Sequence, residues 1–156
     1  MILFADGLKK IRRNLERVQA GEKFRLEKIG RFTDEELDRI NCTRAAKGFP
    51  AIESTIVFHG RHMYKSRCLE NGYSIEQVVQ QAANALSVSS VLDTSHASLV
   101  LKNPIPRYDI EDNRINDQAV FKCTARHPFA ELFSVIPKGD RRTKEAVEKL
   151  KGSLEE

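Results

Sequence analysis

Residues 54–86 read STIVFHGRHMYKSRCLENGYSIEQVVQQAANAL, which places a strand, a basic segment and a helix in succession. The run from Ser54 to Phe58 is rich in β-branched residues and predicts a strand. Ser74 with Gln77 three residues later is a capping-box signature that opens a helix. The apolar residues of this helix recur at helical spacing and predict one buried face. They are Ile75, Val78, Val79, Ala82, Ala83 and Leu86.

The residues before this stretch follow a helical pattern. An apolar stripe at spacings of three and four predicts a helix on an otherwise charged segment, with Gly21 as its end. The stripe consists of Leu8, Ile11, Leu15 and Val18. Thr33 with Glu36 forms a second capping box, and the helix that it opens runs to about Ala46. We therefore treat residues 1–49 as a helical N-terminal part.

The residues after it contain strand-like runs at 97–101, 119–124 and 132–136. Between the first two runs, residues 109–117 are rich in Asp and Asn and indicate a turn or flexible loop. Early helices and late antiparallel strands predict an α+β fold, with the N-terminal helices packed on an antiparallel sheet of about four strands. The last segment, 141–156, indicates a charged helix or tail of the same domain.

The composition is typical of one soluble globular domain. A chain of 156 residues with 40% hydrophobic and 31% charged residues can bury a single core. No apolar run approaches the roughly 20 residues that span a bilayer, and the apolar start stops at Asp6, so we expect neither a membrane span nor a secretory signal. Three widely spaced cysteines argue against a disulfide framework and favour a reducing compartment. No glycine-rich phosphate loop is present in the sequence, so we expect no nucleotide cofactor.

Positive charge is gathered in two blocks of the sequence. Residues 1–32 contain nine Lys or Arg against four Asp or Glu, and residues 59–67 contain three cations and no acid. The next 28 residues contain no Lys or Arg at all. Basic blocks of this kind favour a polyanionic partner such as a nucleic acid.

The block at 59–67 combines groups that move protons with groups that bind phosphate. Metal-independent cleavage of RNA needs a base for the 2′-hydroxyl, an acid for the leaving 5′-oxygen and cations around the phosphate. His59 and His62 suit the first two roles, because the ordinary pKa of histidine is about 6.5. The cations are Arg61, Lys65 and Arg67.

Two backbone conformations are open for this block. In a helix, His62 and Lys65 lie three residues apart on one face. In an extended segment, the three cations share one face, and His62 and Tyr64 lie on the other. Gly60 and the turn at 71–72 favour an irregular or extended backbone.

The end of the second late strand offers another group of polar residues. Strand alternation directs Lys122, Thr124 and Arg126 to one face. His127 follows directly, and Ser134 lies in the next strand. Arginine and hydroxyl groups at such positions are suited to hold phosphate oxygens.

Other chemistries have weaker support in these residues. His59 and His62 lack the HExxH spacing of a zinc site, so we expect no metal. A Gly-x-Ser-x-Gly nucleophile elbow is absent from the sequence. Cys68 has basic neighbours that would lower the pKa of a thiol, but a buried structural cysteine is the simpler interpretation.

The order of these features resembles the Barnase–EndoU–Colicin–RelE superfamily of ribonucleases. The resemblance covers about residues 50–140. It rests on the strand that ends in 59–67, on Asn71-Gly-Tyr-Ser-Ile-Glu-Gln77 at the start of a helix, and on the strands that follow. Within this superfamily, the sequence is similar above all to C-terminal toxin domains of contact-dependent growth inhibition proteins and their phage-borne relatives. The family implies a twisted antiparallel sheet and metal-independent cleavage of RNA, often tRNA, to a 2′,3′-cyclic phosphate.

The resemblance also implies roles for single residues. His62 and His59 would be the general base and acid, and Lys65 and Arg67 would stabilise the phosphorane. The sheet would contribute Arg126, Thr124 or Ser134. We expect further RNA contacts from Arg61, Tyr64, Lys122 and His127. The family further implies an immunity protein that covers the cleft, and action in the bacterial cytoplasm after delivery from a secreted or surface-borne parent.

Two other functions stay open at this point. A non-catalytic nucleic-acid-binding module would need only lysine and arginine, so the concentration of histidine argues against it. A phage structural or protein-interaction domain would use the basic N-terminal helix to dock on a partner. Co-purification of a tight acidic partner without RNA cleavage would favour this last function.

Overall fold

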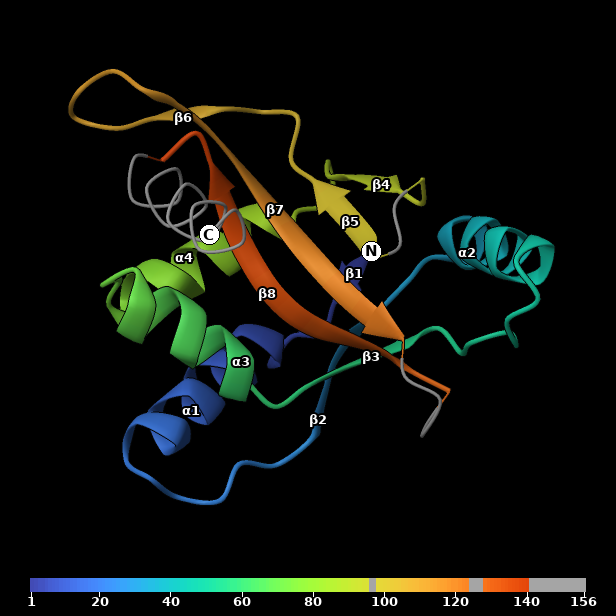
Figure 1. The fold of residues 1–156 in the computed structure, drawn as a ribbon, viewed down its shortest axis with the longest axis horizontal. Coiled ribbons are helices and arrows are strands. Elements are labelled where there is room, and N and C mark those ends of the chain that lie inside the picture. The colour runs from blue at the N-terminus through green and yellow to red at the C-terminus, as the bar shows by residue number, and fades with distance from the viewer. Residues whose placement is uncertain (96–97, 124–127, 141–156) are drawn as a thin grey trace, which may run out of the picture.

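The computed structural model of the chain describes residues 1–95, 98–123 and 128–140, and it shows an α+β fold (Figure 1). Its helices are α1 (Gly7–Gln19), α2 (Asp34–Ala46), α3 (Arg61–Met63), the π-helix η1 (Tyr64–Glu70) and α4 (Ile75–Ala85). Its strands are β1 (Ile2–Leu3), β2 (Glu27–Arg31), β3 (Thr55–Phe58), β4 (Val91–Asp93), β5 (Leu99–Lys102), β6 (Arg107–Tyr108), β7 (Arg114–Cys123) and β8 (Ala130–Lys138). Within these residues, no helix has the length and apolar character needed to cross a membrane.

The strands form one curled sheet in the order β1-β2-β3-β8-β7-β5-β4, with β6 beside β7. The neighbours β3 and β8 run parallel, and Ile56 and Val57 lie opposite Ala130 and Glu131. The other pairs are antiparallel. The prediction of an α+β fold is therefore confirmed, but that of about four antiparallel strands is wrong, because the sheet has eight strands and is mixed.

The additional strands explain this correction. β1 and β2 come from the N-terminal part that was predicted as helical. In β2 only Ile29 and Gly30 are buried, between charged residues, so the strand carries no alternating apolar pattern. The segment 109–117 is also only partly a turn, because β7 already begins at Arg114. The predicted helix or tail at 141–156 lies outside the described residues.

Two capping boxes fix the starts of the longer predicted helices. The Thr33 hydroxyl accepts a hydrogen bond from the Glu36 amide, and the Glu36 carboxylate accepts one from the Thr33 amide. Ser74 and Gln77 form the same reciprocal pair at the start of α4. Each pair satisfies backbone N–H groups that have no partner inside the helix.

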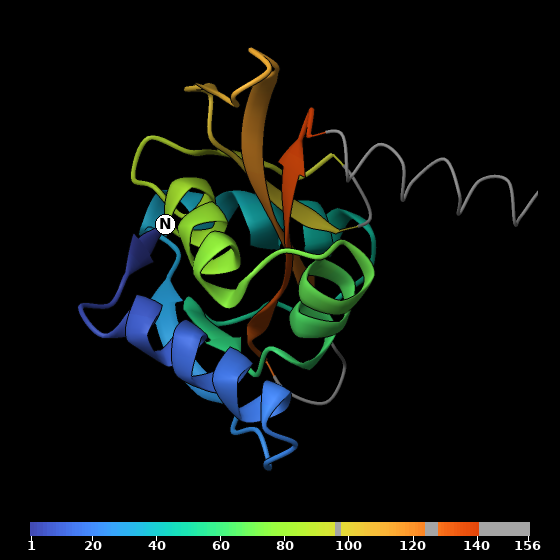
Figure 2. The same ribbon diagram turned by 90° about the vertical axis from the view of Figure 1, so that its left-hand side faces the viewer.

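The helices α1, α4 and α3–η1 pack against one another in front of the sheet, as the view of Figure 2 shows. Helix α2 stands apart from them, near β4 (Figure 1). Residues from both the N-terminal part and the later strands enter one hydrophobic core. The rings of Phe32 and Phe121, for example, meet edge to face at 5.4 Å in this core.

Candidate active site

The site begins where β3 passes into α3. His59 follows the last residue of β3, and Gly60 has a φ of 86°, a left-handed conformation that disfavours other residues. A Cβ atom at Gly60 would also lie 3.0 Å from the ring of Phe58. This glycine therefore allows a sharp turn, and the turn places His59 and His62 next to strand β8.

The block after this turn is helical, so the preference for an irregular or extended backbone is wrong. Arg61–Met63 forms α3, and Tyr64–Glu70 continues it as a π-helix. The physical reason is packing, since Met63 is fully buried in the core and Tyr64 and Cys68 pack against it. π-helical turns are rare and occur frequently at functional sites.

His59 forms a close pair with Glu131 on β8. The His59 Nε2 atom lies 2.6 Å from Oε1 of Glu131, and the two side chains are 23% and 13% exposed. The backbone N–H of Arg61 donates to His59 Nδ1 at 3.1 Å. These two contacts assign the hydrogen of a neutral His59 to Nε2, which donates to the carboxylate. The ring of Phe24 lies 4.8 Å from the His59 ring.

His62, in α3, packs against a neighbouring part of β8, where its ring stacks on Phe133. The two rings are 3.8 Å apart and nearly parallel, at 13°. The Lys122 ammonium lies 3.6 Å from the centre of the same phenyl ring, a cation–π contact. Phe133 is the extra residue of a β-bulge, because Leu132 and Ser134 lie opposite the consecutive residues Phe121 and Val120. Such bulges redirect a side chain next to a site.

The environment of His62 favours its neutral form. Burial lowers the pKa of His62 below its ordinary value, and the positive charges of Lys122, Arg67 and Lys65 lower it further. Glu70 opposes this effect only in part. A neutral imidazole near pH 7 is able to accept a proton.

The two histidine sites share one face of the sheet. Glu131 and Phe133 are two residues apart on β8, which corresponds to about 7 Å along a strand. Lys122 is the cross-strand partner of Glu131 on β7. Strand pairing therefore brings two imidazoles, a carboxylate and an ammonium to one surface, which we call the histidine cluster (His59, His62, Lys122, Glu131 and Phe133).

The other predicted residues of the 59–67 block lie beside this cluster. Arg61 and Lys65 are exposed, and Tyr64 packs against the core. Arg67 is half-buried, and its Nε and Nη1 atoms find no hydrogen-bond partner among the residues that the structure describes. Burial lowers the pKa of Arg67, while Tyr73 and other groups raise it.

The second predicted group is described only in part. Ser134 is 6% exposed within β8, and its hydroxyl makes one long contact of 3.4 Å, to the carbonyl of Val135. Thr124, Arg126 and His127 lie outside the described residues. Lys122 is therefore the member of this group that the structure places in the histidine cluster.

Sequence reasoning missed Glu131 and Phe133, which hold the two histidines. A signal for Glu131 exists, because it alternates with the apolar residues Ala130 and Leu132 and so faces away from the core. Phe133 lies on the same face as Glu131, but an apolar residue in a strand does not by itself indicate a site. Glu131 directly precedes the predicted strand 132–136, and Phe133 lies within it.

The structure gives little support to a nucleophilic cysteine or to a metal site. Burial raises the pKa of the Cys68 thiol, which disfavours a nucleophilic thiolate there. Over the described part of the chain, no three His, Cys, Asp or Glu side chains are grouped as ligands of one metal ion.

No family model matches the chain, and no curated protein or solved structure shows significant similarity to it.

Proposed function

We propose that the chain is an endoribonuclease that cleaves tRNA or another structured RNA without a metal. The 2′-hydroxyl would attack the adjacent phosphate, and the product would carry a 2′,3′-cyclic phosphate. One observation carries this proposal: a histidine stacked on Phe133 and a histidine–carboxylate pair share one face of the sheet with a lysine. These are the groups that general acid–base cleavage of a phosphodiester needs.

His62 is the proposed general base. Its lowered pKa leaves the imidazole free to take the proton of the 2′-hydroxyl as the O2′–P bond forms. Stacking on Phe133 fixes the plane of the ring, so the proton acceptor has a defined direction. Proton transfer by a positioned histidine contributes about 10²- to 10⁴-fold to a rate.

The pair of His59 and Glu131 is the proposed general acid. The Glu131 carboxylate, 2.6 Å from His59 Nε2, would stabilise the positive charge of a protonated His59. When the pair is protonated, His59 Nδ1 turns from acceptor to donor and releases the Arg61 amide. The proton passes from His59 Nδ1 to O5′ as the P–O5′ bond breaks, and His59 returns to its neutral form with Nε2 donating to Glu131.

Three cations are suited to stabilise the charge that grows on the phosphate. Lys122 lies within the histidine cluster, and Arg67 and Lys65 are near enough to affect the pKa of His62. The Nε and Nη1 atoms of Arg67 are buried, so we expect this residue to act on the phosphate through its charge and not through these N–H groups. Contributions from Arg126, Thr124 and Ser134 stay predictions.

The resemblance to bacterial toxin domains supports a biological setting for this activity. In that setting the chain acts in the bacterial cytoplasm, after delivery from a secreted or surface-borne parent protein. A cognate immunity protein would cover the histidine cluster. The exposed cations of the 59–67 block would attract an acidic partner of this kind.

The experiment incubates the chain with total bacterial tRNA in excess EDTA and resolves the products on a denaturing gel. We expect discrete fragments from the parent and from Lys138→Ala, which changes an exposed lysine at the far end of β8. His62→Ala should lose at least nine tenths of the rate. Intact tRNA after incubation with the folded parent would overturn the proposal and favour a binding module.

A further inference from the structure

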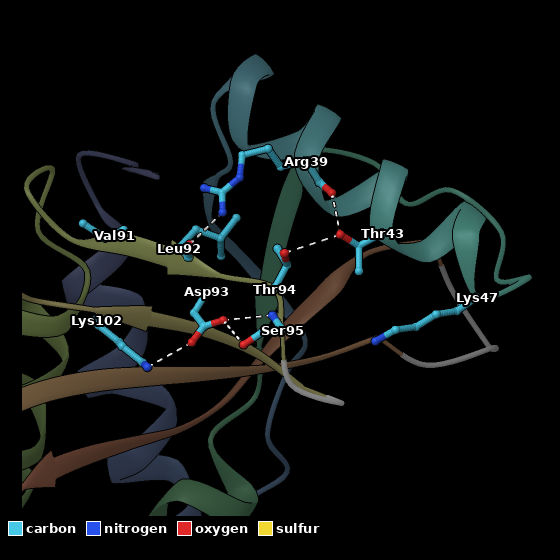
Figure 3. Close-up of a pocket in the computed structure, with 9 residues that line it drawn as sticks. All are labelled: Arg39, Thr43, Lys47, Val91, Leu92, Asp93, Thr94, Ser95 and Lys102. Atoms are coloured by element: carbon cyan, nitrogen blue, oxygen red, sulfur yellow. Dashed lines mark hydrogen bonds and ion pairs between the residues drawn. The ribbon is translucent and has the colours of Figure 1, made fainter.

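A second basic site lies away from the histidine cluster, between α2 and the strands β4 and β5. It is a pocket of about 580 Å³. Figure 3 shows its lining, with Arg39 and Thr43 on α2 on one side and Asp93 and Lys102 on the other. Lys47 follows the last residue of α2, and its side chain is directed toward Ser95. Thr94 and Ser95 add two hydroxyl groups to the wall.

Contacts within the protein hold the helical wall of the pocket in place. Arg39, Thr43 and Lys47 are spaced four residues apart, so they lie along one face of α2. The Thr33 capping box fixes the start of α2, and the Asn41 side chain exchanges two hydrogen bonds with the backbone of Ile52. The cations therefore stand on a rigid element rather than on a loop.

Two of the three cations in the pocket keep their charge available. The Arg39 guanidinium donates to the carbonyl of Leu92 at 3.2 Å, and no carboxylate of the described residues lies within ion-pair distance of Arg39 or Lys47. Lys102 is different, because its ammonium lies 2.9 Å from the Asp93 carboxylate. Hydrogen bonds from Ser95 hold the pKa of Asp93 well below its ordinary value. Asp93 therefore stays ionised, and its negative charge cancels the positive charge of Lys102.

Hydroxyl groups next to unpaired cations are the chemistry that recognises phosphate. The Thr43 hydroxyl donates to the Arg39 carbonyl at 3.1 Å. The Thr94 hydroxyl lies 3.4 Å from the Thr43 hydroxyl. Both hydroxyls face the space between Arg39 and Lys47 (Figure 3). A phosphate group there would lie near two cations and could accept a hydrogen bond from the Thr94 hydroxyl, whereas the hydrogen of Thr43 already goes to the Arg39 carbonyl.

The pocket and the histidine cluster border the same end of strand β7. Arg44, on the same helix as Arg39, is near enough to Cys123 to act on its pKa against the effect of burial. Cys123 is the last residue of β7, and its neighbour Lys122 belongs to the histidine cluster. A single strand of RNA could therefore pass from one site to the other around this end of the sheet.

We propose that the pocket lined by Arg39, Thr43 and Lys47 binds a backbone phosphate of the RNA, remote from the bond that is cut. This inference rests on the proposed function in taking RNA as the ligand. Binding at the pocket would position the strand without reading its sequence, because phosphate contacts carry no base information.

The test measures binding of a fluorescent RNA oligonucleotide whose 2′-hydroxyls are all methylated, so that it cannot be cut by 2′-hydroxyl attack. Fluorescence anisotropy gives the dissociation constant over a series of salt concentrations. Arg39→Ala and Lys47→Ala should each weaken binding about threefold to tenfold and reduce the salt slope by about 0.7 to 0.9. Lys138→Ala is the matched control and should change neither quantity. Thermal unfolding of each variant shows that the fold is kept.

Unchanged affinity and salt slope in the double variant Arg39→Ala/Lys47→Ala would overturn the inference. So would a double variant that loses binding of inorganic phosphate, measured by calorimetry, but keeps the RNA affinity of the parent. The proposed ribonuclease activity fails separately. If the parent leaves natural RNA intact while the variants still lose affinity for the methylated RNA, the pocket stands as an RNA site and the enzyme assignment falls.

Discussion

The substitution Glu131→Gln should separate the general acid from the general base. A glutamine side chain keeps a carbonyl oxygen where Glu131 accepts the hydrogen of His59 Nε2, so the neutral pair keeps its geometry. What is lost is the negative charge that holds an added proton on the pair. Loss of a general acid slows a reaction by about 10²- to 10⁴-fold, or about 2.7 to 5.4 kcal/mol of transition-state stabilisation. The stability of the protein should change much less, by about 1 kcal/mol.

Two substrates make the assay specific for the acid. One is a ribonucleotide dimer, whose 5′-oxygen needs a proton to leave. The other is a nucleoside 3′-(4-nitrophenyl phosphate), whose nitrophenolate leaves without one. Glu131→Gln should be slow on the dimer and near the parent rate on the ester, whereas His62→Ala should be slow on both. Glu35→Gln is the matched control, because Glu35 is an exposed carboxylate in the first turn of α2.

An equal loss on both substrates would refute this reasoning, because Glu131 would then not serve the leaving group. A parental rate on the dimer would refute it as well. Either result would leave the contact between His59 and Glu131 as a structural feature at the end of β3.

Three further predictions address the neighbours of the pair. Lys122→Met should move the acidic limb of the pH–kcat/KM profile to higher pH. Burial and then the charge of Lys122 lower the pKa of His62, and activity is lost as the pH falls through that pKa. An acidic limb that does not move would show that His62 is not the base. Phe133→Ala should lower the free energy of unfolding by about 1 to 2.5 kcal/mol, through loss of the ring stack and the cation–π contact, as urea denaturation would measure. Gly60→Ala should destabilise more than Gly72→Ala in the same assay. Both glycines have positive φ, at a cost to alanine of about 1 to 2 kcal/mol, but only at Gly60 does the new Cβ meet a ring; equal losses would show that this contact relaxes freely.

The elements with complete local signals were predictable from the sequence. Helix α4 has both arms of its capping box, from Ser74 and Gln77, and a broad apolar face. Helix α2 has the same cap at Thr33. Strand β3 was predicted from a β-branched run, and the structure places it at 55–58. In each case propensity, capping and periodicity indicate the same structure, which is the condition for reliable prediction.

The missed elements depend on tertiary contacts. Strands β1 and β2 are short and carry no apolar alternation. Their pairing with each other, and of β2 with β3, defines them. The block after Gly60 becomes helical because Met63 reaches the core, against the local signal of its flanking turns. The parallel pairing of β3 with β8 joins residues more than seventy positions apart, and no local pattern indicates it.

The candidate site was predictable in its residue types and not in its pairing. The concentration of His59 and His62 with cations marked the segment that contributes both imidazoles of the histidine cluster. Their different surroundings come from β8, where Glu131 meets one histidine and Phe133 the other. This difference is what suggests an acid and a base, and it arises from the parallel strand pairing and the bulge.

The measurement that tests the central claim most directly compares two RNA oligonucleotides of one sequence, with and without 2′-O-methyl groups, in excess EDTA. The account predicts that the chain cuts only the unmodified strand and that mass spectrometry finds a 2′,3′-cyclic phosphate on the 5′ fragment. Cleavage of both strands, or a 5′-phosphate on the 3′ fragment, would contradict attack by the 2′-hydroxyl and the roles given to the histidine cluster.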